Sequence, residues 1–134
     1  YGCVRPQDLA AVLDDTVCLV SCMFVNNELG SVNPVRELAA AAHDRGIPFH
    51  TDGVQAPGKI PVDVHALGID YATFSGHKVF GPKGAGVLYV REGAPLDSLI
   101  VGGAQEQGRR AGTESTHDIV GCGAAFGRGR VAFQ

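Results

Sequence analysis

TVCLVSCMFV, residues 16–25, is the longest apolar run of the chain. Residues 17–25 are rich in β-formers, and two aspartates before the run and two asparagines after it mark its ends. A continuous apolar run bounded by such residues is typical of a strand that is buried on both faces, so we predict a strand inside a sheet. With ten residues, the run is half of the roughly 20 that a membrane-spanning helix needs.

A helix is predicted directly downstream. Asn33 precedes Pro34, which fits an N-cap followed by proline at the first helical position, and Gly46 fits the C-terminal cap. His43 is expected on the exposed side of this helix. The apolar positions recur at helical spacing: Val35, Leu38, Ala39 and Ala42.

Three further strands are expected, over residues 47–51, 71–75 and 84–90. The connection between the first two is about 20 residues, enough for a parallel crossover, whereas the GPKG turn before 84–90 is too short for one and favours an antiparallel strand. After a glycine-rich loop, a last helix is predicted over 116–126. The fold class is therefore α/β, with a mixed, mostly parallel sheet flanked by helices and no boundary inside 1–134.

Composition restricts the classes of partner. The chain is 45% hydrophobic and 19% charged, with a net charge of −3, so it is expected to fold and shows no basic footprint for nucleic acid or an anionic membrane. The four cysteines have neither metal-site nor disulfide-scaffold spacing, so reduced thiols in the cytoplasm are expected, all structural, with Cys18 and Cys22 on one side of the first strand. Because it begins at Tyr1 without methionine and ends at Gln134, we expect a fragment.

Polar side chains follow three of the predicted strands: Asn27, then Asp52 with Gln55, then Ser75, His77 and Lys78. In an open parallel sheet, the loops at the carboxyl ends converge on one crevice. A lysine amine beside such a crevice can form a Schiff base with a carbonyl compound, and pyridoxal phosphate is the common partner.

Pyridoxal phosphate needs a carboxylate at its ring nitrogen and donors for its phosphate. Asp52 can supply the first, and Ser75 with His77 the second. A metal hydrolase that uses His50, Asp52 and His77 as ligands remains an alternative.

Five segments, in this order, resemble the cysteine desulfurases and selenocysteine lyases of the class V aminotransferase group. They are VNNELGSVNPVREL (25–38), HTDGVQ (50–55), SGHK (75–78), GPKGAGVLYVR (81–91) and GRRAGTES (108–115). The resemblance implies the large pyridoxal-phosphate-binding domain of a fold-type I enzyme, of which residues 1–134 would be the central part.

The resemblance also implies a role for each matching residue. Lys78 forms the Schiff base with the cofactor, Asp52 pairs with the pyridine nitrogen, and Gln55 bonds the ring hydroxyl. The others contact the phosphate or the substrate: Ser75 and His77 hold the phosphate, Thr113 reaches the phosphate of the neighbouring subunit's cofactor in a homodimer, and Asn27 lies near the cofactor and the substrate carboxylate.

The implied activity converts L-cysteine to L-alanine and passes the sulfur to a protein thiol as a persulfide, for iron–sulfur cluster assembly or thiolation through sulfur-acceptor proteins. The family's sulfur-accepting cysteine and substrate-binding arginine lie downstream of the segment that matches GRRAGTES, so the chain is expected to be inactive alone. A selenocysteine lyase and a non-catalytic folded core remain alternatives.

Overall fold

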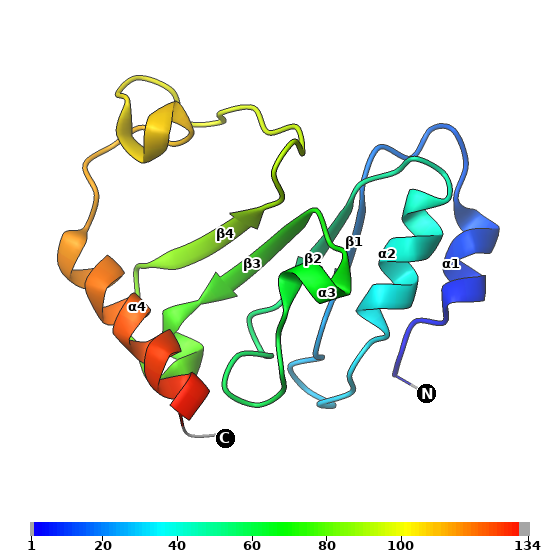
Figure 1. Ribbon diagram of the computed structural model, residues 1–134, viewed down its shortest axis with the longest axis horizontal. Coiled ribbons are helices and arrows are strands. Elements are labelled where there is room, and N and C mark those ends of the chain that lie inside the picture. The colour runs from blue at the N-terminus through cyan, green and yellow to red at the C-terminus, as the bar shows by residue number, and fades with distance from the viewer. Residues whose placement is uncertain (1, 132–134) are drawn as a thin grey trace.

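The computed structural model describes residues 2–131, with side chains through Arg128; Tyr1 and residues 132–134, at the ends of the predicted domain, lie outside the described residues. Its centre is a four-stranded sheet in the order β1-β2-β3-β4 (Figure 1). The strands are β1 (Val20–Met23), β2 (Phe49–Asp52), β3 (Tyr71–Ser75) and β4 (Gly86–Val90). The pairs β1–β2 and β2–β3 are parallel and β3–β4 is antiparallel, which confirms the mixed, mostly parallel sheet.

Connection length explains the strand directions. The helix α2 (Val35–His43) carries the chain from β1 back to the start of β2, and a segment with the short helix α3 (Val64–Leu67) does the same between β2 and β3. Between β3 and β4 there is only the one-turn 3₁₀ helix η1 (Gly76–Val79) and a turn, so β4 runs back alongside β3.

The first strand differs from its prediction. It is four residues long, and its burial is one-sided: Val20 is buried, Ser21 exposed, and Leu19 before the strand is 46% exposed. In the described part of the chain β1 is an edge strand with helices on one face only, so half of the apolar run has no layer to pack against. Cys18 is exposed, which contradicts its expected burial beside Cys22.

The helix prediction is confirmed for the body of α2 and wrong at its start. Pro34 occupies the N-cap position, and Asn33 does not cap the helix. Instead, the buried Asn33 side chain accepts a hydrogen bond from the Val4 amide at 2.8 Å and donates one to the Met23 carbonyl at 2.7 Å. Gly46, with φ of 70°, follows the end of the helix in the left-handed conformation that glycine adopts readily.

Three further helical elements complete the chain: α1 (Pro6–Val12), η2 (Gln105–Gly108) and α4 (Thr116–Val131). Of these, the sequence predicted only α4, and it extends beyond residue 126. No helix among residues 2–131 is long and apolar enough to cross a membrane.

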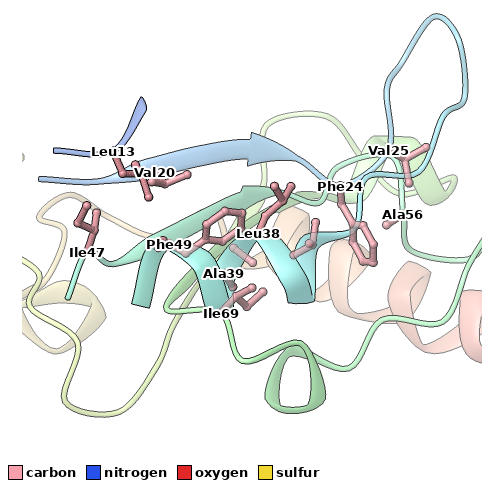
Figure 2. Packing of buried hydrophobic residues seen from close by; sticks show 13 residues of the cluster. Leu13, Val20, Phe24, Val25, Leu38, Ala39, Ile47, Phe49, Ala56 and Ile69 are labelled. Atoms are coloured by element: carbon pink, nitrogen blue, oxygen red, sulfur yellow. The ribbon is translucent and has the colours of Figure 1, made fainter. Parts of the chain in front are cut away.

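The core lies between the sheet and the helices α1, α2 and α3. Phe49, Leu38 and Ile69 are fully buried, and Figure 2 shows Phe49 and Leu38 side by side between strands and helix. Full burial of one such side chain stabilises the fold by about 1.5–3 kcal/mol. This layer holds β2 and β3 in place and so fixes where their carboxyl ends emerge.

A second set of contacts fastens the amino ends of β2 and β3. Asp70, immediately before β3, is 2% exposed, and its Oδ2 accepts hydrogen bonds from His43 Nε2 and the Phe49 amide, both at 2.7 Å. The Arg91 guanidinium pairs with Oδ1. Burial alone would raise the pKa of Asp70, but these hydrogen bonds and the charges of His43 and Arg91 outweigh burial and lower it. The expected solvent-facing His43 thus has a buried partner.

Candidate functional site

The polar groups that the sequence singled out gather at the carboxyl ends of β2 and β3. Along β2, Phe49 and Thr51 are buried in the core, while His50 and Asp52 alternate with them and point to the other face of the sheet. Asp52 pairs in register with Thr73 of β3, and Ser75 ends β3. In Figure 1, η1 follows directly at the carboxyl end of β3.

Asp52 is half-buried and only partly engaged. Its Oδ1 accepts a hydrogen bond from the Val54 amide at 2.9 Å, which holds the carboxylate at the start of the turn after β2. Within the described residues, Oδ2 has no hydrogen-bond partner. A half-buried carboxylate with one free oxygen can accept a hydrogen bond from the protonated ring nitrogen of a ligand.

The Lys78 amine is also free. Lys78 belongs to η1, directly after β3, and is exposed, with no hydrogen bond or ion pair to any residue that the structure describes. Beside it, Ser75 Oγ and His77 Nδ1 lie 2.6 Å apart, so hydroxyl and imidazole are already turned toward each other at one strand end. Phe80, with φ of 64°, reverses the chain after η1 and bonds its amide to the Gly76 carbonyl.

An apolar hollow lies next to this turn. It has a volume of about 640 Å³ and is lined by Lys78, Val79 and Phe80 together with Ala124 and Ala125 of α4. Of the site residues that the sequence predicted, only Lys78 lines this hollow.

Helix α4 packs closely against η1. A Cβ added at Gly76 would lie 2.7 Å from Sγ of Cys122 and 3.3 Å from its Cα, so only glycine fits there without displacement. Cys122 is 3% exposed, in line with its predicted structural role. Nearby, Phe74 and Phe126 pack edge to face with ring centroids 6.4 Å apart. The position of the lysine turn therefore depends on α4.

The remaining three predicted residues are less closely tied to this cluster. Gln55 is half-buried, and its Oε1 accepts a hydrogen bond from Lys59 Nζ at 3.2 Å. Asn27 is exposed, while its neighbour Asn26 forms the turn after β1. Thr113 is exposed in the segment between η2 and α4.

Sequence reasoning gave His50 only the role of a possible metal ligand, whereas the structure places it in a hydroxyl network. Nδ1 of His50 is 2.8 Å from Ser21 Oγ, and Nε2 is 3.3 Å from Thr73 Oγ1. Alternation along HTDGVQ could have placed His50 on the face of Asp52, but its hydroxyl partners come from strands about 20 to 30 positions away.

The metal-hydrolase alternative is not supported. Among residues 2–131, no group of three or more histidine, cysteine, aspartate or glutamate side chains is arranged to hold a metal ion. Both ring nitrogens of His50 already face hydroxyl groups, and His77 Nδ1 faces Ser75.

Fold and site together define an α/β domain that presents a lysine and a carboxylate at the ends of adjacent parallel strands. The model of the aminotransferase class-V family matches residues 1–127, and the chain belongs to this family.

Similar proteins carry more specific names. The chain is 50% identical over 125 residues to the cysteine desulfurase IscS of Methanosarcina thermophila, covering 93% of this chain and 31% of the relative. It is also 50% identical over 122 residues to the cysteine desulfurase NifS of Azotobacter vinelandii, covering 91% and 30%. The chain thus spans about a third of the length of the relatives it matches.

Solved structures agree with this similarity. A NifS-like protein superposes with a TM-score of 0.93 at 40% identity, over 97% of this chain and 36% of that one. A structure described as SspA in complex with cysteine gives a TM-score of 0.89 at 43% identity, over 94% and 37%.

Proposed function

We propose that this chain is the central part of the large, cofactor-binding domain of a pyridoxal-phosphate-dependent cysteine desulfurase. The observation that carries the proposal is the pairing of β2 with β3, which puts the free Oδ2 of Asp52 and the unpaired amine of Lys78 at the ends of neighbouring parallel strands. A carboxylate, a free amine and a hydroxyl–imidazole pair form a donor set that suits this cofactor.

When bound, pyridoxal phosphate supplies an electron sink for negative charge at the substrate carbon. Lys78 would hold the cofactor through Nζ, and its amine would move a proton at the substrate Cα. The negative charge of Asp52 Oδ2 would keep the ring nitrogen protonated. Ser75 and His77 would donate hydrogen bonds to the phosphate.

Three residues complete the proposed site. The Gln55 amide would form a hydrogen bond with the ring hydroxyl, and it would give up its contact with Lys59 to do so. Asn27 serves the cofactor and the substrate carboxylate from the loop after β1. Thr113, exposed in the segment between η2 and α4, would reach the phosphate of the cofactor in a second subunit of a homodimer, as the family resemblance implies.

The proposed substrate is L-cysteine, which yields L-alanine and a persulfide on a protein thiol for sulfur-acceptor proteins of iron–sulfur cluster assembly or thiolation. Relatives named cysteine desulfurases and a similar structure described in complex with cysteine support it. These relatives do not favour the selenocysteine lyase alternative. A cytoplasmic location and homodimerisation remain predictions from the family resemblance.

Chemical trapping tests the cofactor site. The chain is mixed with pyridoxal phosphate and reduced with borohydride, and its peptides are analysed by mass spectrometry. We expect one pyridoxyl group, on Lys78, that is absent in Lys78→Ala and unchanged in the matched control Lys83→Ala, which removes an exposed lysine from the adjacent turn. Labelling spread evenly over Lys59, Lys78 and Lys83 would count against a built site.

Turnover is tested separately, by release of alanine from L-cysteine. With the chain alone we expect the label on Lys78 without alanine, since the resemblance puts the sulfur-accepting cysteine and the substrate-binding arginine outside these residues. Alanine release by the wild-type chain, lost in Lys78→Ala, would show that the fragment is catalytically complete.

A further inference from the structure

His50 ties together three parallel strands at the level of the candidate site. Its ring lies on β2, with Nδ1 2.8 Å from Ser21 Oγ of β1 and Nε2 3.3 Å from Thr73 Oγ1 of β3. Both hydroxyls can donate or accept, so the bridge is compatible with either imidazole tautomer. His50 and Asp52 are separated by one residue and point to the same face of the sheet, opposite the core.

We propose that His50 is a positioning residue: its bridge from Ser21 to Thr73 fixes the end of β2 so that the Asp52 carboxylate faces the ring nitrogen of bound pyridoxal phosphate. This inference rests on the proposed function for the identity of the ligand. Thr73 couples the two residues, because it contacts His50 through its hydroxyl and is the register partner of Asp52.

The surroundings of His50 make its ring sensitive to Asp52. Burial lowers the pKa of His50, and the negative charge of Asp52 opposes this shift without cancelling it. In β3, the register partner of His50 is Tyr71, a titratable group whose hydroxyl donates to the Pro95 carbonyl. Its neighbours from β1, Ser21 and Met23, carry no charge.

The first arm of the test needs no cofactor. Ring-nitrogen NMR shifts of His50 are followed against pH in the apo chain. We expect Asp52→Asn to move the titration midpoint of His50 to lower pH, because the charge that favours the imidazolium is gone. Asp15→Asn, an exposed control, leaves the midpoint unchanged. An unchanged midpoint in Asp52→Asn would show that the two side chains are not coupled and would overturn the proposal.

The second arm compares side chains of similar size that differ in hydrogen bonding. His50→Leu fills the space but breaks both bridges, whereas His50→Gln can bond a hydroxyl on each side. We expect His50→Leu to weaken the affinity for pyridoxal phosphate about tenfold and to shift the pH dependence of the bound cofactor's absorption, and His50→Gln to restore the affinity to within about twofold. Thr73→Val should add little weakening in the His50→Leu background.

The outcomes separate the two proposals. Equal affinities for wild type, His50→Leu and His50→Gln would overturn the positioning role while leaving the cofactor site intact. If no variant binds pyridoxal phosphate, the proposed function fails for this chain, and the NMR arm still decides whether His50 and Asp52 are coupled. Circular dichroism and urea unfolding of each variant exclude misfolding as the cause of weakened binding.

Discussion

The two ends of the parallel strands each carry an aspartate, in opposite states. At the amino end, Asp70 is 2% exposed and both of its oxygens are engaged, by His43, the Phe49 amide and Arg91. At the carboxyl end, Asp52 is half-buried, one of its oxygens has no partner in residues 2–131, and the nearby Lys78 amine is free as well. The carboxylate at the amino end is fully paired within the chain, whereas the carboxylate and the lysine amine at the carboxyl end are open to a ligand.

This difference separates stability from binding. A buried carboxylate whose partners come from a helix, a strand and a loop holds these elements together, and removing it leaves its partners unsatisfied. A carboxylate with a free oxygen contributes little to the folded state alone and can give its interaction to a bound molecule. Substitutions at the amino end should therefore act on unfolding, and those at the carboxyl end on the cofactor.

The largest effect on stability is expected for Asp70→Asn. The neutral amide cannot form an ion pair with Arg91. Its NH₂ group also has to face either Arg91 or the His43 ring and the Phe49 amide, where the carboxylate oxygens accept hydrogen bonds. Because Arg91 and His43 are partly exposed, we expect a loss of about 2–3 kcal/mol of unfolding free energy, somewhat less than the roughly 3–5 kcal/mol for a fully buried ion pair that is broken.

Urea unfolding at neutral pH measures this loss, with Asp15→Asn as an exposed control that should leave the midpoint in place. If Asp70→Asn changed the free energy of unfolding by less than about 0.5 kcal/mol, the contacts of Asp70 would not stabilise the amino end of the strands.

Gly76→Ala is expected to have the second-largest effect on stability and to reduce cofactor binding as well. The added Cβ would lie 2.7 Å from Cys122 Sγ and 3.2 Å from its Cβ, so η1 and α4 must separate. Overpacking of this kind costs about 1–3 kcal/mol, and the displaced turn carries Lys78, so cofactor labelling should fall too. Cys122→Ala removes the sulfur, so the double variant should recover part of both losses in a double-mutant cycle. Strict additivity would contradict the proposed contact.

Local pattern accounts for the elements that the sequence predicted well. The strand over 71–75 has its predicted bounds, because an apolar run with β-formers stops at Gly76, and β4 is antiparallel because the preceding turn is short. The same kind of pattern overestimated the length and burial of β1, since an apolar run in the sequence does not say whether helices cover both faces of the strand.

Contacts between residues distant in the chain account for what the sequence could not predict. Asn33 looked like an N-cap from its neighbours alone, yet the fold brings Val4 and Met23 to its side chain. His43 pairs with Asp70 across 27 positions.

At the site, the order of strands predicted that Asp52 and Lys78 emerge at one edge. The contact of Gln55 with Lys59 depends on the geometry of the turn after β2, which no spacing rule predicts.

Acid should lower the free energy of unfolding by protonating the Asp70 carboxylate at the amino end of the strands. The pKa of Asp70 is lowered in the fold from its usual value of 3.8, so its contribution to stability is complete above that value. It is lost as pH falls from there through the folded-state pKa, because the unfolded chain binds the proton first. The free energy of unfolding should therefore fall more steeply with acid in wild type than in Asp70→Asn. Parallel pH profiles of the two proteins would assign the acid dependence to other groups.

The smallest effect on stability is expected for Lys78→Ala and Asp52→Asn, where the effect on the cofactor is greatest. Neither side chain makes an ion pair within the described residues, and the single contact of Asp52 Oδ1, to the Val54 amide, can be kept by an asparagine oxygen. Each substitution should thus change the free energy of unfolding by less than about 0.5 kcal/mol. Lys78→Ala should lose the pyridoxyl label entirely, and Asp52→Asn should bind pyridoxal phosphate more weakly, because the neutral amide cannot stabilise a protonated ring nitrogen. Urea midpoints measured beside cofactor titrations check both halves, and a destabilisation comparable to that of Asp70→Asn would show that the carboxyl end is also part of the structural framework.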